Sequence, residues 1–350
     1  MRGGIMERPV LLVLDDHEGE IAAAPAMQRL RSLAHVTRLD HSPRPEDMCL
    51  LARAQVILAV RERTRIDAAF LAACPRLELL LQTGGHAYHI DLDAAGARGI
   101  PVALGRRVST PARVIPELVF TLLLALVRRL EPTLQAMRAG QWPSVLGGSL
   151  HGRRLGILGH GRLGRPVARL AQAFGMEVFA WDRLGSQPVP DEYGVRFLPL
   201  DELLSHCDVI TIHLRLSPES RALIGAEQLA LMKPGALLIN TSRGAIVDQD
   251  ALVDALSSGR LGGAGLDVFD TEPLSPTSPL RSMEQVLLTP HCGWMVRDLF
   301  HEFVEIAADQ LQAWLGAGLP AEELANPLLP GASPVCRRAT NPDPLAGADS

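Results

Sequence analysis

Short apolar runs alternate with segments of helical period through the first hundred residues. A short apolar run between turn residues is typical of a strand buried in a parallel sheet. Apolar residues at i, i+3, i+4 and i+7 indicate an amphipathic helix instead. The order predicts an α/β domain in which helices flank a parallel sheet. The expected strands are 9–15, 36–39, 55–60, 77–81 and 102–103.

The stretch 109–116, S-T-P-A-R-V-I-P, interrupts this alternation with two prolines, and a strongly apolar helix is expected over 117–129. We place a domain crossing here, because a crossing helix must bury apolar faces on both sides. Another helix is expected over 296–314, with Phe300, Phe303 and Leu311 on one face. The predicted parts are a first domain over 1–112, a second over 113–296, a return helix in 297–326 and a flexible tail over 327–350.

The second half repeats the alternation of strands and helices, which predicts a second parallel sheet. Helices are expected around 201–205, 225–232 and 249–257. The expected strands are 155–158, 176–181, 195–198, 209–213, 236–240, 263–268 and 286–289.

One stretch of the second half organises the rest: a strand over 155–158, then Gly159, Gly161 and Gly164, then a helical pattern and a strand that ends at Asp182. In a dinucleotide-binding fold, the first glycine allows a tight turn, the second lets the backbone approach a pyrophosphate, and the third allows close helix packing. The helix N-terminus favours phosphate, and the terminal acid is placed to meet a ribose. The alternative is a structural glycine turn in another kind of α/β protein.

Three later stretches place polar side chains just after expected strands: N-T-S-R-G, G-L-D-V-F-D-T-E-P and T-P-H-C-G-W. Because strand ends collect at one edge of a parallel sheet, we expect Arg243, Glu272 and His291 to converge. A histidine with a carboxylate partner can deliver a proton to a carbonyl oxygen, and an arginine can pair with a substrate carboxylate. Taken singly, each has a plain alternative: a structural histidine, a surface ion pair or a turn residue.

Composition narrows the classes of protein. The 350 residues are 47% hydrophobic and 21% charged, with a net charge of −5, which is typical of a globular chain and gives no sign of nucleic-acid binding. We expect no membrane span and no signal peptide. Five cysteines are scattered without metal-ligand spacing, so we expect reduced thiols, no metal and a cytoplasmic protein.

Two turns of the first half are also candidates for ligand binding. R-E-R-T, beginning at Arg61, follows an expected strand, where open α/β sheets place ligand sites; a solvated loop is the alternative. Q-T-G-G-H, which contains Gly84 and Gly85, follows the next strand.

These motifs resemble the D-isomer-specific 2-hydroxyacid dehydrogenase family, whose members include reductases of 2-oxo acids such as glyoxylate and hydroxypyruvate. The matching text is L-G-I-L-G-H-G-R-L-G, then N-T-S-R-G-A-I-V-D, then G-L-D-V-F-D-T-E-P-L and L-T-P-H-C-G-W. The resemblance implies a Rossmann cofactor domain inserted into a substrate domain, and a homodimer. Charge and apolar run lengths independently predict no nucleic-acid partner and no membrane partner.

The resemblance also implies roles for single residues. Arg243 would bind substrate, His291 would be the acid and base, and Glu272 would be its partner. Gly84 and Gly85 would hold the substrate carboxylate through backbone amides. The remaining implied contacts are with the dinucleotide, through Arg162, Leu163, Leu214, Thr241, Ser242, Asp267 and Gly293.

Some positions depart from the family pattern and leave alternatives open. The turn carries His86, where many members have an aspartate-containing pattern, so His86 could contact substrate or simply belong to the loop. Trp294 could line the substrate pocket or pack at the domain crossing.

Asp182 favours NAD, because a carboxylate repels a 2′-phosphate, whereas the adjacent Arg183 leaves NADP possible.

The expected function is reversible hydride transfer between NAD(H) and a 2-oxo and D-2-hydroxy acid pair. Two alternatives stay open. One is a dinucleotide-sensing, corepressor-like binding module on the same scaffold. The other is a relative that acts on formate or phosphite.

Overall fold

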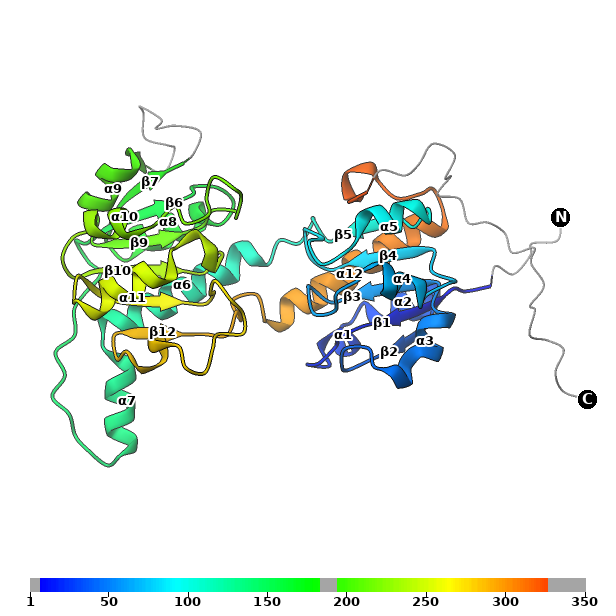
Figure 1. Ribbon diagram of the computed structural model, residues 1–350, viewed down its shortest axis with the longest axis horizontal. Helices are drawn as coiled ribbons and strands as arrows, with labels where there is room; N and C mark the ends of the chain where they lie inside the picture. The colour runs from blue at the N-terminus through cyan, green and yellow to red at the C-terminus, as the bar shows by residue number, and fades with distance from the viewer. Residues whose placement is uncertain (1–6, 183–193, 327–350) are drawn as a thin grey trace, which may run out of the picture. The chain divides into compact units, whose positions relative to one another are not determined.

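The computed structural model describes residues 7–182 and 194–326. The chain divides into two compact units: unit 1 comprises residues 1–108 and 297–350, and unit 2 comprises residues 109–296. Figure 1 shows both units, with colour running from blue at the N-terminus to red at the C-terminus. Arg183 and the tail over 327–350 lie outside the described residues.

Unit 1 contains a five-stranded sheet in the order β2-β1-β3-β4-β5, and every pairing in it is parallel. Strands β3 and β4 are fully buried, as continuous apolar runs require in a sheet covered on both faces. The strands are β1 Val10–Val13, β2 His35–Arg38, β3 Val56–Ala59, β4 Leu79–Gln82 and β5 Val102–Leu104. The helices are α1 Glu20–Ala23, α2 Met27–Leu33, α3 Met48–Arg53, α4 Ala68–Ala72, α5 Leu92–Ala97 and α12 Arg297–Leu315, with short 3₁₀ turns η1 Pro45–Asp47 and η4 Ala321–Glu323.

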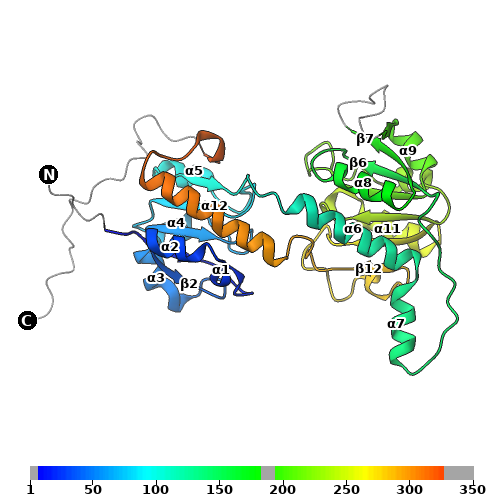
Figure 2. The same cartoon turned by 180° about the vertical axis from the view of Figure 1, so that it is seen from behind.

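Helix α12 brings the end of the described chain back to unit 1, where it packs against α1 and α2 (Figure 2). Its buried face carries Phe300, Phe303 and Leu311. Beyond it, the Asn326 side chain accepts a hydrogen bond from the Val102 amide at 3.0 Å and donates to the Ile100 carbonyl at 2.9 Å. Residues more than 200 positions apart in sequence therefore complete one core.

Unit 2 contains a seven-stranded parallel sheet in the order β12-β11-β10-β9-β6-β7-β8. The strand order runs outward in both directions from β6, the doubly wound arrangement of a Rossmann fold. The predicted fold class is confirmed. The strands are β6 Arg154–Leu158, β7 Glu177–Trp181, β8 Arg196–Phe197, β9 Val209–Ile212, β10 Ala236–Asn240, β11 Leu261–Leu266 and β12 Val286–Leu288. The helices are α6 Pro111–Val127, α7 Leu130–Arg138, α8 Gly164–Ala173, α9 Leu200–His206, α10 Ala226–Leu231 and α11 Gln249–Ser257, with 3₁₀ turns η2 Gly244–Ile246 and η3 Pro279–Ser282.

Helix α6 begins six residues before the expected start at 117, and the proline-containing stretch belongs to it. Pro111 occupies the first turn, where its missing N–H has no intrahelical partner to lose. Pro116 lies inside the helix and is buried with Ile115 and Val119, so packing offsets the lost backbone bond. Helix α7 was not expected at all. Within 7–182 and 194–326, no helix has the length and apolar character needed to cross a bilayer.

Candidate active site and cofactor site

The glycine turn after β6 has the geometry that each glycine was expected to provide. Gly159 has φ +96°, and a Cβ there would lie 2.9 Å from the His213 carbonyl oxygen. A Cβ on Gly164 would lie 2.2 Å from the Gly159 carbonyl oxygen, so only glycine lets α8 begin there. Gly161 is exposed, and a Cβ on it would meet no atom within 4 Å. The turn is therefore closely packed at Gly159 and Gly164, whereas the space beside Gly161 is open.

Neighbouring strand ends supply polar atoms beside this turn. Ser242 donates its hydroxyl to the Leu214 carbonyl, and a Leu214 methyl lies 3.0 Å from where a Gly159 Cβ would be. The buried Thr241 hydroxyl oxygen has no hydrogen-bond partner among the described residues. Asp182 follows the last residue of β7. A glycine turn at a helix N-terminus, an unmatched hydroxyl and an acid at the next strand end together fit a dinucleotide.

A histidine and a carboxylate form a pair at the ends of the outer strands. His291 Nδ1 lies 2.7 Å from Glu272 Oε2, and Glu272 Oε1 accepts a hydrogen bond from the Phe269 amide at 2.9 Å. Burial by itself would raise the pKa of Glu272, but the hydrogen bonds from His291 and Phe269 lower it below its ordinary value. The carboxylate is therefore ionised at neutral pH and holds the Nδ1 edge of the imidazole ring.

Arg243 lies close to this pair. The Asn240 side chain forms the turn that carries it, accepting from the Ser242 amide at 3.0 Å and donating to the Arg243 carbonyl at 3.1 Å. A Cβ on Gly244 would lie 1.9 Å from the Phe269 carbonyl carbon, so the Arg243 turn packs directly on the segment leading to Glu272. The positive charge of Arg243 also contributes to the lowered pKa of Glu272. The structure thus brings together the three residues that the sequence predicted to converge.

Asp267 forms a clamp on the loop that carries His291. Its carboxylate is 1% exposed and accepts the Thr289 hydroxyl at 2.5 Å and the amides of Cys292 and Gly293, both at 2.9 Å. Between those contacts His291 has φ +54°, an unusual conformation for a residue with a side chain. Sequence reasoning missed the contributions of Thr289 and Cys292, because two of the three donors are backbone amides, which leave no sequence signal.

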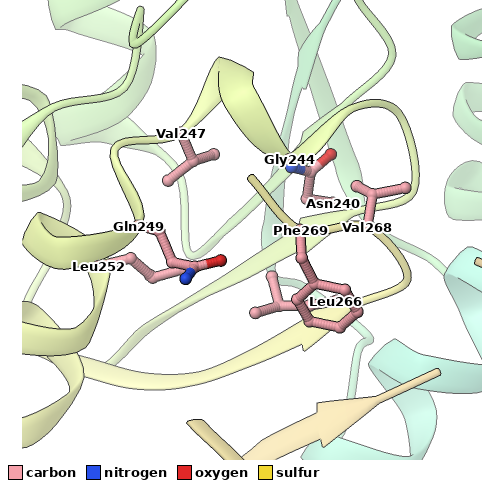
Figure 3. Close-up of a pocket in the computed structure, with 8 residues that line it drawn as sticks. All are labelled: Asn240, Gly244, Val247, Gln249, Leu252, Leu266, Val268 and Phe269. Carbon is pink, nitrogen blue, oxygen red and sulfur yellow. The ribbon is translucent and has the colours of Figure 1, made fainter. Parts of the chain in front are cut away.

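A small, mostly apolar hollow lies beneath the Arg243 turn (Figure 3). Side chains of α11 and β11 form part of its wall. Its lining residues are Asn240, Gly244, Val247, Gln249, Leu252, Leu266, Val268 and Phe269.

The substrate candidates of unit 1 lie at the ends of β3 and β4. Arg61 has φ +60°, and its amide donates to the Thr83 hydroxyl at 2.9 Å. Its guanidinium Nη1 lies 3.3 Å from where a Cβ of Gly84 would be, while Gly85 is exposed with open space around it. The remaining candidate, Trp294, is half-buried in unit 2, just after the Asp267 clamp.

A doubly wound sheet, a glycine turn at a helix N-terminus and a His–Glu pair beside an arginine define the class of NAD-binding oxidoreductases. The family model described as "D-isomer specific 2-hydroxyacid dehydrogenase, NAD binding domain" matches residues 120–293. A glyoxylate reductase of Korarchaeum cryptofilum is 38% identical over 261 residues, which are 73% of this chain and 78% of that protein. The chain belongs to the D-isomer-specific 2-hydroxyacid dehydrogenase family, as the motifs predicted, and NAD(H) is its cofactor.

Two further similarities frame the question of substrate. A D-3-phosphoglycerate dehydrogenase of Mycobacterium bovis is 37% identical over 293 residues, 82% of this chain but 53% of that protein, so the chain spans about half of its length. The solved structure of a D-lactate dehydrogenase of Aquifex aeolicus, in complex with NAD and lactic acid, is 28% identical with a TM-score of 0.71, over 87% of this chain and 95% of that one. The named substrates of these relatives share the 2-hydroxy or 2-oxo acid group and differ beyond it.

Proposed function

We propose that this NAD-dependent 2-hydroxyacid dehydrogenase interconverts a 2-oxo acid and its D-2-hydroxy acid, with His291 as proton donor and acceptor. The observation that carries the proposal is the 2.7 Å pair between His291 Nδ1 and Glu272, formed beside Arg243. Bound NAD(H) supplies or takes the hydride. Because Glu272 engages Nδ1, His291 has Nε2 left to give the proton to the carbonyl oxygen or to take it from the alcohol.

Glu272 and Arg243 have complementary charges in this proposal. The ionised Glu272 fixes the ring orientation and stabilises the imidazolium before proton transfer. Arg243 binds the substrate carboxylate and polarises the carbonyl. We also assign Arg61, Gly84 and Gly85 to binding of the substrate carboxylate, and Trp294 to contact with the substrate side chain.

The cofactor assignments rest on the geometry of the glycine turn and on the buried Thr241 hydroxyl that lacks a protein partner. Asp182 would meet the ribose and favour NAD over NADP, and Arg183, the next residue in sequence, is the candidate for accommodating a 2′-phosphate. The pyrophosphate contacts would come from Gly159, Gly161, Arg162, Leu163 and Gly164, and the nicotinamide contacts from Leu214, Thr241, Ser242, Asp267 and Gly293.

The test is oxidation of NADH and NADPH at neutral pH against a panel of 2-oxo acids, from glyoxylate and hydroxypyruvate to branched and phenyl-bearing acids. We expect turnover of a subset with NADH. Tight NADH binding without turnover of any acid would contradict the proposal and favour a dinucleotide-sensing module. Turnover of formate or phosphite alone would favour the other alternative.

We further propose a cytoplasmic homodimer. The cysteines within the described residues are free thiols, which fits a reducing compartment. Helix α7 extends from the rest of unit 2 (Figure 1), and its Leu130, Leu134 and Met137 side chains are 43–46% exposed. The segment after it exposes Trp142 and Leu146 at 89% and 93%. Light scattering after gel filtration should give a molar mass twice that of one chain. The double substitution Trp142→Ser and Leu146→Ser should lower this mass towards that of a single chain.

A further inference from the structure

The turns after β3 and β4 contain a charged group that the proposed mechanism does not use. Glu62 Oε1 lies 3.0 Å from His86 Nε2, and Glu62 Oε2 lies 3.4 Å from Arg61 Nε. One carboxylate thus joins the arginine of one turn to the histidine of the next. We call Arg61, Glu62 and His86 the edge triad.

The edge triad lies against the glycine turn proposed to bind the substrate carboxylate. Arg61 Nη1 and Gln82 Nε2 lie 3.3 Å and 3.2 Å from where a Gly84 Cβ would be. Gln82 Nε2 also donates to the Arg61 carbonyl at 3.1 Å, so the backbone of that residue is fixed as well. The Arg61 guanidinium thus lies next to both the Glu62 carboxylate and Gly84.

Glu62 remains a negative charge at working pH. Burial by itself would raise the pKa of its carboxyl, but the hydrogen bond from His86 and the charge of Arg61 lower it to about 2. Burial also lowers the pKa of the nearby His89. Glu62 therefore offsets the positive charge of Arg61 at the carboxylate-binding turn, and a second anionic group of a substrate would find no net positive charge from this pair.

We propose that Glu62 is a specificity-determining and positioning residue: it holds Arg61 and His86 at the carboxylate-binding turn, and its charge makes this edge select monoanionic 2-oxo acids over acids with a second anionic group. The inference rests on the proposed function and deepens it. Like charges brought together in a partly desolvated site repel, which is a common source of specificity. This preference would distinguish the protein from enzymes that act on phosphorylated acids. It would place the protein with reductases of small 2-oxo acids whose side chains carry no charge.

The test compares glyoxylate and hydroxypyruvate with oxaloacetate and 3-phosphohydroxypyruvate in the full-length protein. Wild type should prefer the monoanionic acids. Glu62→Gln should raise KM for them with little change in kcat, and should shift the ratio of kcat/KM towards the dianionic acids by at least about tenfold. Glu62→Asp keeps the charge and should keep the wild-type ratio while raising KM. NADH binding, followed by fluorescence, should be unchanged in both variants.

The matched control is Glu18→Gln. Glu18 also pairs with an arginine of the same turn, accepting from Arg63 Nη1 and Nη2 at 2.8 Å and 2.6 Å, and should leave the ratio unchanged. A Glu62→Gln variant that lowers kcat/KM for both classes of acid by one factor would show a merely structural role and overturn the inference. So would a wild type that prefers dianionic acids. A wild type that reduces none of these acids would instead refute the proposed function.

Discussion

The carboxyl edges of the two parallel sheets order their polar groups by different means. In unit 2 the backbone does most of the ordering: glycines close the turn after β6, and Asp267 holds two backbone amides of the His291 loop. In unit 1 side chains do it: Glu62 joins Arg61 to His86 by contacting the guanidinium of one and the ring Nε2 of the other. Contacts that fix the backbone hold a turn in one conformation, whereas pairs between charged side chains respond to charge and pH.

This difference teaches where chemistry and selectivity belong in the molecule. Proton transfer needs a histidine held to within tenths of an ångström, which buried backbone contacts provide. Selection among acids needs an electrostatic field, which charged side chains at the sheet edge provide. Substitutions at the unit 2 edge should therefore change kcat or cofactor binding, and those at the unit 1 edge should change substrate preference.

The largest effect is expected for His291→Ala. Loss of the proton donor should lower kcat by about 10²- to 10⁴-fold, since general acid–base catalysis contributes that much. NADH binding should stay nearly intact, because the glycine turn is untouched. Steady-state kinetics and NADH fluorescence measure the two effects, with the exposed His151→Ala of the same unit as the control. Near-full turnover of the His291 variant would show that another group donates the proton.

Two glycine variants should separate folding from binding. Gly164→Ala places a Cβ 2.2 Å from a carbonyl oxygen, and should cost about 1–3 kcal/mol of unfolding free energy together with NADH affinity. Gly161→Ala places its Cβ in open space, and should weaken NADH binding roughly tenfold with an unchanged melting temperature. Equal losses of melting temperature in the two variants would contradict the assignment of Gly161 to the cofactor.

Asp267→Asn should disturb the His291 loop by weakening the hydrogen bonds that hold its backbone. An amide NH₂ would face the donors Cys292 N–H or Gly293 N–H, and an unmatched buried donor costs about 1–3 kcal/mol. We expect a lower melting temperature and a kcat lowered by about tenfold or more. Asp270→Asn, at an exposed acid three residues away, is the matched control. Unchanged kcat in the Asp267 variant would remove its positioning role.

The smallest effect is the pH dependence of stability at the unit 1 edge. The pKa of Glu62 falls from 4.5 to about 2 on folding, so its charge stabilises the folded state above pH 4.5, and this contribution is lost as the pH falls towards 2. The melting temperature of wild type should exceed that of Glu62→Gln most above pH 4.5, and the gap should narrow below it. A gap that widens on acidification would show that the pair is not formed.

The sequence predicted the fold and the convergence of three polar side chains in unit 2, because their signals are local. Apolar runs, the spacing of Gly159, Gly161 and Gly164, and the strand-end positions of Arg243, Glu272 and His291 are all visible in one dimension. Convergence followed from a general property of parallel sheets, whose carboxyl ends share one edge. The predicted start of α6 was wrong because its two prolines were interpreted as a break in the helix. A proline is tolerated in the first turn of a helix, and also in the interior where packing offsets the lost hydrogen bond.

Only the tertiary structure decided which partners each charged side chain has. Glu62 and His86 are 24 positions apart, and R-E-R-T reads equally well as a solvated loop. The clamp of Asp267 on backbone amides is equally invisible, since every residue except proline carries the same N–H group. Local patterns fix which elements form, whereas the pairing of side chains depends on distances that exist only once the strands are side by side.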